Sequence, residues 1–286
     1  LRVMLRIAIQ SKGRLYEESM ALLEEAGIKI PGGKRTLLVP ARNFPVEVLF
    51  LRDDDIPESV ASGVADVGIV GLNEVMEKRC PVGILKKLGF GKCRLSLAIP
   101  QDIDYQDRNW FSGKKIATSY PGILSDYLHK NGIVSDIHVI TGSVEIAPGI
   151  RLADAIFDIV SSGSTLVSNR LKEVETVVES EAVLIGTDSI SPEKRGILDE
   201  LLFRFDSVQA ADDKKYILMN VPQKKLNDVL SVLPGIKSPT VMPLADKEWC
   251  SVHTVLDEKC FWEIINRLKT AGAEGILVLD IEKMIL

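Results

Sequence analysis

The chain has 286 residues, 46% of them hydrophobic and 26% charged, which is the balance of a globular protein with two or three domains. Its formal net charge of −5 argues against a general nucleic-acid binder, which would be basic. No run of 18 apolar residues suggests a membrane span, and the short apolar start, interrupted by Arg2 and Arg6, is not typical of a secretory signal.

The first two thirds of the chain alternate between strand and helix patterns. Apolar runs bounded by turn residues predict strands over 5–9, 46–51, 65–70, 94–100, 115–118, 137–141 and 157–160. Helical spacing predicts helices over 15–26, from 56 to about 63, from 121 to 131 and over 150–155. The alternation predicts an α/β fold with parallel sheets. We expect two lobes around a cleft, with the ends of the strands facing it.

The last 75 residues follow a different pattern. Strands are predicted over 216–221, 240–244, 249–256 and 275–281, and helices over 224–233 and 258–270. The order βαββαβ is typical of a ferredoxin-like domain. Small domains of this kind often sense ligands, which is an analogy of fold.

The segment from Asp154 to Leu166 carries the most chemistry. Asp154 and Asp158 lie four residues apart, and five small residues follow them: Ser161, Ser162, Gly163, Ser164 and Thr165. Hydroxyl groups and amides around a glycine can converge on an anion, and a helix starting at Leu166 would add partial positive charge. The pattern indicates a site for phosphate plus ribose, or for phosphate plus metal; the alternative is a turn that caps an ordinary helix.

Three further groups follow predicted strands. Lys12, Gly13 and Arg14 form a basic turn suited to phosphates or a nucleotide, although a solvated turn would look the same. Arg52 precedes three aspartates, one of which can cap a helix, and Glu145 lies in a later loop. The four cysteines form no Cys-x-x-Cys pair, so we expect no zinc framework, and reduced thiols favour a cytoplasmic location.

Several motifs, in order, resemble one family. They are Lys12-Gly-Arg-Leu15, Arg52-Asp-Asp-Asp-Ile-Pro57, Asp66-Val-Gly-Ile-Val-Gly71, Cys93-Arg-Leu-Ser96, Lys115-Ile-Ala-Thr-Ser-Tyr-Pro121, Gly142-Ser-Val-Glu-Ile-Ala-Pro148, Ser238-Pro-Thr-Val-Met-Pro-Leu244 and Ile276-Leu-Val-Leu-Asp280. From about Leu5 to the C-terminus the chain resembles the long form of ATP phosphoribosyltransferase, which catalyses the first step of histidine biosynthesis.

The resemblance implies two periplasmic-binding-protein-like lobes and a C-terminal ferredoxin-like regulatory domain. We expect the first lobe over 1–94 with 186–210, the second over 95–185 and the regulatory domain over 211–286. The resemblance also implies a dimer or hexamer acting on small molecules, with no nucleic acid or membrane as partner.

The resemblance assigns the site residues as well. It implies that phosphoribosyl pyrophosphate (PRPP) binds to Asp154, Asp158 and residues 161–165, and ATP near Lys12, Gly13, Arg14 and Arg52. Catalytic roles are expected for Arg14, Arg52 and Glu145, with Mg²⁺ carried mainly on the pyrophosphate and its protein ligands unknown. Feedback inhibition by L-histidine is expected at five positions: Asn220, Ile236, Thr240, Val255 and Gly275. Some relatives carry Asp where Asn220 stands, so the strength of inhibition is open.

Two other functions fit the residues. A solute-binding protein without catalysis would have the same two lobes, although a phosphate loop in the cleft and the missing signal argue against it. A catalytically silent regulatory relative would also fit the fold, and the intact loop with both basic clusters argues against that.

Overall fold

The computed structural model describes residues 3–32, 36–234 and 239–286. The chain forms one unit that ends at Glu200 and a second that begins at Leu201. The boundary therefore falls inside helix α6 (Pro192–Ala211), ten residues before the predicted start of the last domain. Among the described residues, no helix combines the length and apolar character that crossing a bilayer requires.

The first sheet of the first unit has the strand order β2-β3-β1-β4-β11-β5. Its strands are β1 (Leu5–Gln10), β2 (Leu38–Pro40), β3 (Val46–Leu51), β4 (Val67–Gly71), β5 (Gly83–Lys87) and β11 (Ala182–Gly186). The associated helices are α1 (Arg14–Glu25), η1 (Asp53–Asp55), α2 (Ile56–Ala61) and α3 (Leu72–Lys78). β1 pairs in parallel with β3 and β4, as predicted, but β11 is antiparallel to both its neighbours. The sheet is mixed because β2 pairs antiparallel with β3, and because β11 returns from the second sheet antiparallel to β4 and β5.

Glycine lets helix α2 approach this sheet closely. A Cβ on Gly68 of β4 would lie 2.6 Å from a methyl group of Ile56 and 3.0 Å from one of Val60. Ile56 and Val60 are buried with Ala8 of β1 in one hydrophobic cluster. The glycine therefore serves packing, because any side chain there would push the helix off the sheet.

The second sheet has the order β10-β6-β9-β7-β8. Its strands are β6 (Cys93–Pro100), β7 (Lys115–Thr118), β8 (Asp136–Val139), β9 (Ala155–Val160) and β10 (Leu171–Ser180), and its helices are η2 (Arg108–Phe111), α4 (Pro121–Lys130), η3 (Val144–Ile146) and α5 (Ser164–Ser168). The helix predicted over 150–155 is wrong. Arg151 has a φ of 61°, which ends any helical turn, and β9 begins at Ala155.

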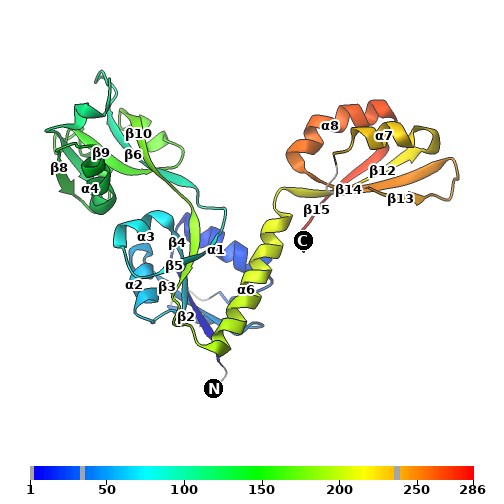
Figure 1. Cartoon of the computed structure of the whole chain (residues 1–286), viewed down its shortest axis with the longest axis horizontal. Coiled ribbons are helices and arrows are strands. Elements are labelled where there is room, and N and C mark those ends of the chain that lie inside the picture. The colour runs from blue at the N-terminus through cyan, green and yellow to red at the C-terminus, as the bar shows by residue number, and fades with distance from the viewer. Residues whose placement is uncertain (1–2, 33–35, 235–238) are drawn as a thin grey trace. The chain divides into compact units, whose positions relative to one another are not determined.

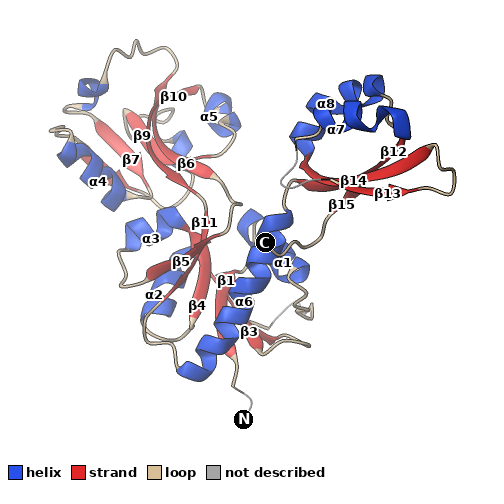
Figure 2. Cartoon of the chain, turned by 45° about the vertical axis from the view of Figure 1, so that its right-hand side comes forward, coloured by secondary structure: helices blue, strands red, loops and turns tan. Residues whose placement is uncertain are grey.

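The chain crosses between the two sheets twice, from β5 to β6 and from β10 to β11 (Figure 2). This exchange, with an antiparallel strand returned to the first sheet, gives the two α/β lobes of a periplasmic-binding-protein-like fold. It also moves the predicted boundaries, because β11 belongs to the first lobe and the second lobe begins at Cys93. Helices α3 and α4 join the lobes: the carboxylate of Glu77 accepts the amides of Gly122 and Ile123, at 2.8 and 2.9 Å.

The second unit has the predicted βαββαβ order. Its elements are β12 (Lys214–Pro222), η4 (Gln223–Lys225), α7 (Leu226–Val232), β13 (Thr240–Pro243), β14 (Trp249–Asp257), α8 (Glu258–Ala271) and β15 (Glu274–Asp280). The antiparallel order β13-β14-β12-β15 is that of a ferredoxin-like domain. Both helices cover the same sheet face (Figure 1), burying Ile217, Val252, Phe261 and Leu268, and the other face carries exposed side chains.

Candidate active site

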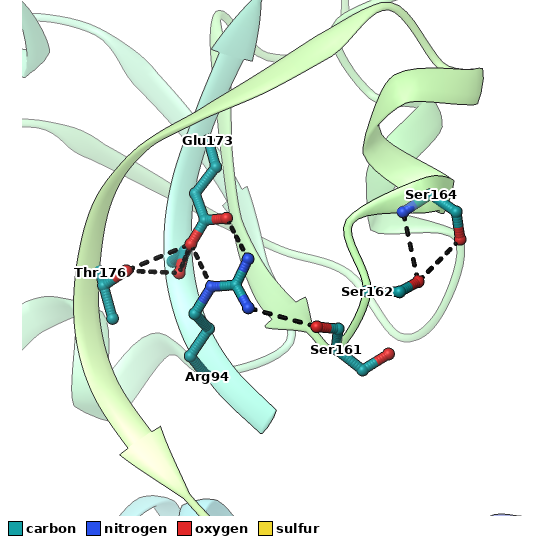
Figure 3. A network of polar contacts seen from close by, with 7 residues as sticks. Arg94, Ser161, Ser162, Ser164, Glu173 and Thr176 are labelled. Carbon is teal, nitrogen blue, oxygen red and sulfur yellow. Dashed lines mark hydrogen bonds and ion pairs between the residues drawn. The ribbon is translucent and has the colours of Figure 1, made fainter. Parts of the chain in front are cut away.

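The small-residue loop joins β9 to α5. Gly163 has a φ of 80°, a left-handed conformation that glycine adopts readily, and it turns the chain into the helix. The helix begins at Ser164, two residues before the predicted start at Leu166. The amides of Ser164 and Thr165 therefore lie in the first turn, where a helix offers them no acceptor. The Ser162 hydroxyl lies 2.9 Å from that of Ser164 and 3.4 Å from its amide (Figure 3), so hydroxyls and amides gather at one place.

Asp158 lies near the end of β9, directly before this loop. Its carboxylate accepts the amide of Ile159 at 2.8 Å. Burial raises the pKa of Asp158 to about 6; the Ile159 bond opposes the rise and the charge of Glu145 adds to it. Glu145 lies in η3, which packs against β9, so the structure brings these two carboxylates near each other.

Asp154 lies at the other end of the strand. It directly precedes β9, and its carboxylate accepts the amide of Lys115 at 2.9 Å, which fixes the start of β7. Four residues of a strand span about 13 Å, whereas four residues of a helix would have placed the two carboxylates on adjacent turns. The structure thus separates Asp154 from Asp158, and we do not retain them as a pair that holds one ribose.

Sequence reasoning did not single out Arg94, the side chain beside the start of the loop. It pairs with Glu173 and donates to the carbonyl of Ser161 (Figure 3). The motif Cys93-Arg-Leu-Ser96 contributes to the family resemblance, which implies no role for Arg94. The sequence does hold one signal for Arg94: side chains two residues apart on a strand share a face, so Arg94 and the buried Ser96 lie on the same face of β6.

The basic residues of the first lobe follow two neighbouring parallel strands. β1 and β3 end side by side, with Gln10 opposite Leu51, so the turn 12–14 and Arg52 lie at the same sheet edge. Gly13 has a φ of 93° where α1 begins, and Lys12 is exposed. Arg14 contacts Glu18 at 3.1 Å, and Arg52, whose side chain is 78% exposed, contacts Asp54 at 3.2 Å. Both guanidiniums can reach solvent-borne ligands.

Tyr120 marks where the two lobes approach each other. Its hydroxyl donates to Glu74 of the first lobe at 2.9 Å. Burial and then the Glu74 charge raise the pKa of Tyr120 well above its usual range, and both Asp158 and Asp53 contribute to the rise. Carboxylates of the two lobes therefore act on one buried hydroxyl, at the place where Tyr120 of the second lobe meets Glu74 of the first.

In the second unit, the residues expected to bind histidine gather on the sheet face away from the helices. Asn220 of β12 and Thr240 of β13 lie on the two strands that flank β14, opposite Ser251 and His253, and Val255 follows on β14 itself. Gly275 has a φ of 56°, and a Cβ there would lie 3.3 Å from the side-chain amide nitrogen Nδ2 of Asn220. Ile236 lies outside the described residues. Sequence reasoning missed His253, whose ring nitrogens lie 2.7 Å from the Tyr216 hydroxyl and 2.9 Å from that of Ser251 on this face.

Comparisons with known proteins agree over the whole chain. A family model described as ATP phosphoribosyltransferase matches residues 52–207, and one described as HisG, C-terminal domain, matches residues 211–283. ATP phosphoribosyltransferases of Bacteroides fragilis (strain ATCC 25285) and Phocaeicola vulgatus are 70% and 71% identical over 283 residues, which are 99% of this chain and 100% of each relative. A solved chain of the ATP phosphoribosyl transferase (HisG:HisZ) complex from Thermotoga maritima aligns with a TM-score of 0.61 at 27% identity, over 71% of this chain and 98% of that one.

The fold and these matches define a phosphoribosyl glycosyltransferase built on two α/β lobes. The chain belongs to the ATP phosphoribosyltransferase family, and it is an enzyme of histidine biosynthesis. The match to the C-terminal domain lies within the second unit, so the chain carries a catalytic part and a separate C-terminal domain.

Proposed function

We propose that the enzyme joins the adenine N1 of ATP to C1 of PRPP, giving N1-(5-phosphoribosyl)-ATP and pyrophosphate. The observation that carries this proposal is the loop 161–165, whose hydroxyls and first-turn amides converge directly after Asp158. Such a group of donors suits the 5-phosphate. The carboxylate of Asp158, near the end of the preceding strand β9, suits the ribose. Membership of the family supports the same reaction.

The chemistry is a displacement at C1. The N1–C1 bond forms with the N1 lone pair, the bond from C1 to the pyrophosphate oxygen breaks, and its electron pair leaves with pyrophosphate. Because N1 is already nucleophilic, no strong base is needed, and catalysis depends on alignment and on stabilising charge. Positive charge develops on the ribose, and in this proposal the ionised carboxylate of Asp158, reinforced by the nearby charge of Glu145, stabilises it.

Residues of the first lobe complete the site in this proposal. Arg14 and Arg52 bind the polyphosphate of ATP and the departing pyrophosphate, and Lys12 with the Gly13 backbone contributes further donors. Among the described residues no group of three His, Cys, Asp or Glu is arranged to hold a metal ion. Mg²⁺ bound to phosphate oxygens needs just one or two carboxylates, which Asp158 and Glu145 can supply. When bound, Mg²⁺ neutralises charge on the pyrophosphate.

Pyrophosphate release tests the reaction. The enzyme should release pyrophosphate when mixed with ATP, PRPP and Mg²⁺, and omission of either substrate should abolish the signal. Thr165→Ala should weaken PRPP binding, whereas Ser168→Ala is its control, because the Ser168 hydroxyl donates to the Ser164 carbonyl within α5. Arg52→Ala should change a Michaelis constant or turnover, with the distant Arg108→Ala as control. No pyrophosphate release from the wild type would refute the function.

We further propose that L-histidine inhibits the enzyme from the second unit. Support comes from the shared sheet face of Asn220, Thr240 and Val255, and from the room that Gly275 leaves beside Asn220. Inhibition should be noncompetitive with at least one substrate, and Thr240→Val should weaken histidine binding measured by calorimetry. Purely competitive inhibition against both substrates would refute a separate site. We also propose a homo-oligomer, a dimer or hexamer, in the cytoplasm, in keeping with four free cysteines.

A further inference from the structure

Arg94 connects the candidate phosphate loop to a strand outside it. The guanidinium donates from Nη1 to the carbonyl of Ser161, the first residue of the loop, at 3.2 Å. Its other edge is held by Glu173 of β10: Nε donates to Oε1 and Nη2 donates to Oε2, each at 2.5 Å (Figure 3). A single side chain of β6 therefore ties the loop to β10.

Glu173 is itself held in place from the sheet. Ser96, which is 1% exposed, donates its hydroxyl to the Glu173 carboxylate at 2.7 Å, and Thr176 donates at 3.2 Å. The Arg94 bond is the largest of the causes that lower the pKa of Glu173 to about 2. The carboxylate thus stays ionised at neutral pH, and a bidentate pair with a planar fork gives the guanidinium one defined orientation.

The direction of the Ser161 carbonyl determines where the next amide points. In a trans peptide the carbonyl and the following N–H point in opposite directions. Because the Ser161 carbonyl faces Arg94, the N–H of Ser162 faces away from the guanidinium. Figure 3 shows Arg94 on one side of Ser161 and the side chains of Ser162 and Ser164 on the other, so this N–H is directed to the side where the loop's hydroxyls gather.

We propose that Arg94 is a positioning residue for the 5-phosphate of PRPP: it holds the Ser161 carbonyl so that the Ser162 amide donates to the phosphate, and Glu173 orients Arg94 for this task. This inference rests on the proposed function, because it takes the loop as the 5-phosphate site. Lysine cannot replace arginine here, since an ammonium lacks the planar fork that serves two carboxylate oxygens and a carbonyl together.

The test uses two partial ligands of the full-length enzyme. Ribose 5-phosphate reports on the 5-phosphate site, and pyrophosphate reports on the other end of PRPP. Arg94→Lys should weaken ribose 5-phosphate binding about tenfold, the loss of one charge-assisted hydrogen bond, and leave pyrophosphate binding unchanged in calorimetry. In kinetics the KM for PRPP should rise by a similar factor, while the KM for ATP stays constant.

Two conservative variants serve as matched controls. Arg108→Lys changes an arginine bound to Asn131, and Glu175→Gln changes a β10 carboxylate that accepts the Tyr105 hydroxyl; neither should alter either ligand. Glu173→Gln should weaken ribose 5-phosphate in the same direction, and should add little in the Arg94→Lys background if both residues act through one contact. Should Arg94→Lys fail to fold, Glu173→Gln carries the test alone.

The outcomes separate this inference from the proposed function. Equal losses for both ligands would show a merely structural role and overturn the inference. Unchanged ribose 5-phosphate binding in Arg94→Lys, together with a loss in Thr165→Ala, would overturn the inference and leave the loop assignment standing. Unchanged binding in both variants would overturn the loop assignment as well.

Discussion

The ionised carboxylate of Asp158 should lower the free energy of unfolding of the protein. Its pKa lies at about 6 in the folded chain against an ordinary value of 3.8, with burial as the main cause. Ionisation is therefore harder in the folded state than in the unfolded state. The penalty is absent below the unfolded pKa, grows as the pH rises through the folded pKa, and is complete above it.

The size of the penalty follows from the pKa difference. A difference of about two units corresponds to roughly 3 kcal/mol, and screening of a half-buried group reduces this to about 1–3 kcal/mol. Asp158→Asn abolishes the ionisation while its amide oxygen can still accept the Ile159 N–H. At pH 7.5 the variant should thus exceed the wild type in free energy of unfolding, although its activity should be lost.

Urea unfolding, followed by circular dichroism between pH 4 and pH 8, measures this difference. The advantage of Asp158→Asn should shrink towards zero as the pH falls to 4. In a Glu145→Gln background the advantage should be smaller, because the Glu145 charge contributes part of the raised pKa. If the difference in free energy of unfolding between variant and wild type were the same at every pH, whatever its sign, the reasoning would be refuted.

Other residues allow equally direct tests. The kcat/KM for PRPP of the wild type should rise with pH through about 6 and then level off, and a pH–rate profile without this rise would contradict the role of the ionised Asp158. Gly163→Ala, at a φ of 80°, should cost about 1–2 kcal/mol and raise the KM for PRPP, whereas Gly113→Ala, at a φ of 73°, should cost similar stability without changing that KM. Glu77→Ala removes the acceptor of two amides and should lower the free energy of unfolding by about 2 kcal/mol in urea titrations. Asn220→Asp should lower the inhibition constant of L-histidine several-fold, since a carboxylate can pair with its ammonium group.

Periodicity predicted elements whose burial alternates regularly. The strand 46–51 was predicted with its observed bounds, and the C-terminal βαββαβ order was confirmed. β10 was not predicted, although it has ten residues, because its pairing with β6 shifts register twice, after Glu173 and after Thr176. Such bulges break the alternation of polar and apolar residues that reveals a strand. β11 likewise could not be assigned to the first lobe from sequence, since its partners are more than 90 residues away.

The site was predicted where it depends on local sequence and missed where it depends on pairing between strands. The loop 161–165 and the glycine turn could be read directly, because they form one continuous segment. Arg94 and Glu173 lie 79 residues apart and meet only because β6 and β10 pair. The roles of these two side chains therefore needed the structure.

The separation of Asp154 from Asp158 also clarifies the chemistry. Two carboxylates on adjacent helical turns would be coupled and could share a proton, as a general acid and base do. On a strand they act independently, and Asp158 alone lies near the loop 161–165, half-buried and with Glu145 raising its pKa. A carboxylate that is ionised above pH 6 suits the proposed reaction, in which the attacking nitrogen needs no base and positive charge develops on a sugar. The geometry of β9 thus favours charge stabilisation over proton transfer as the role of this residue.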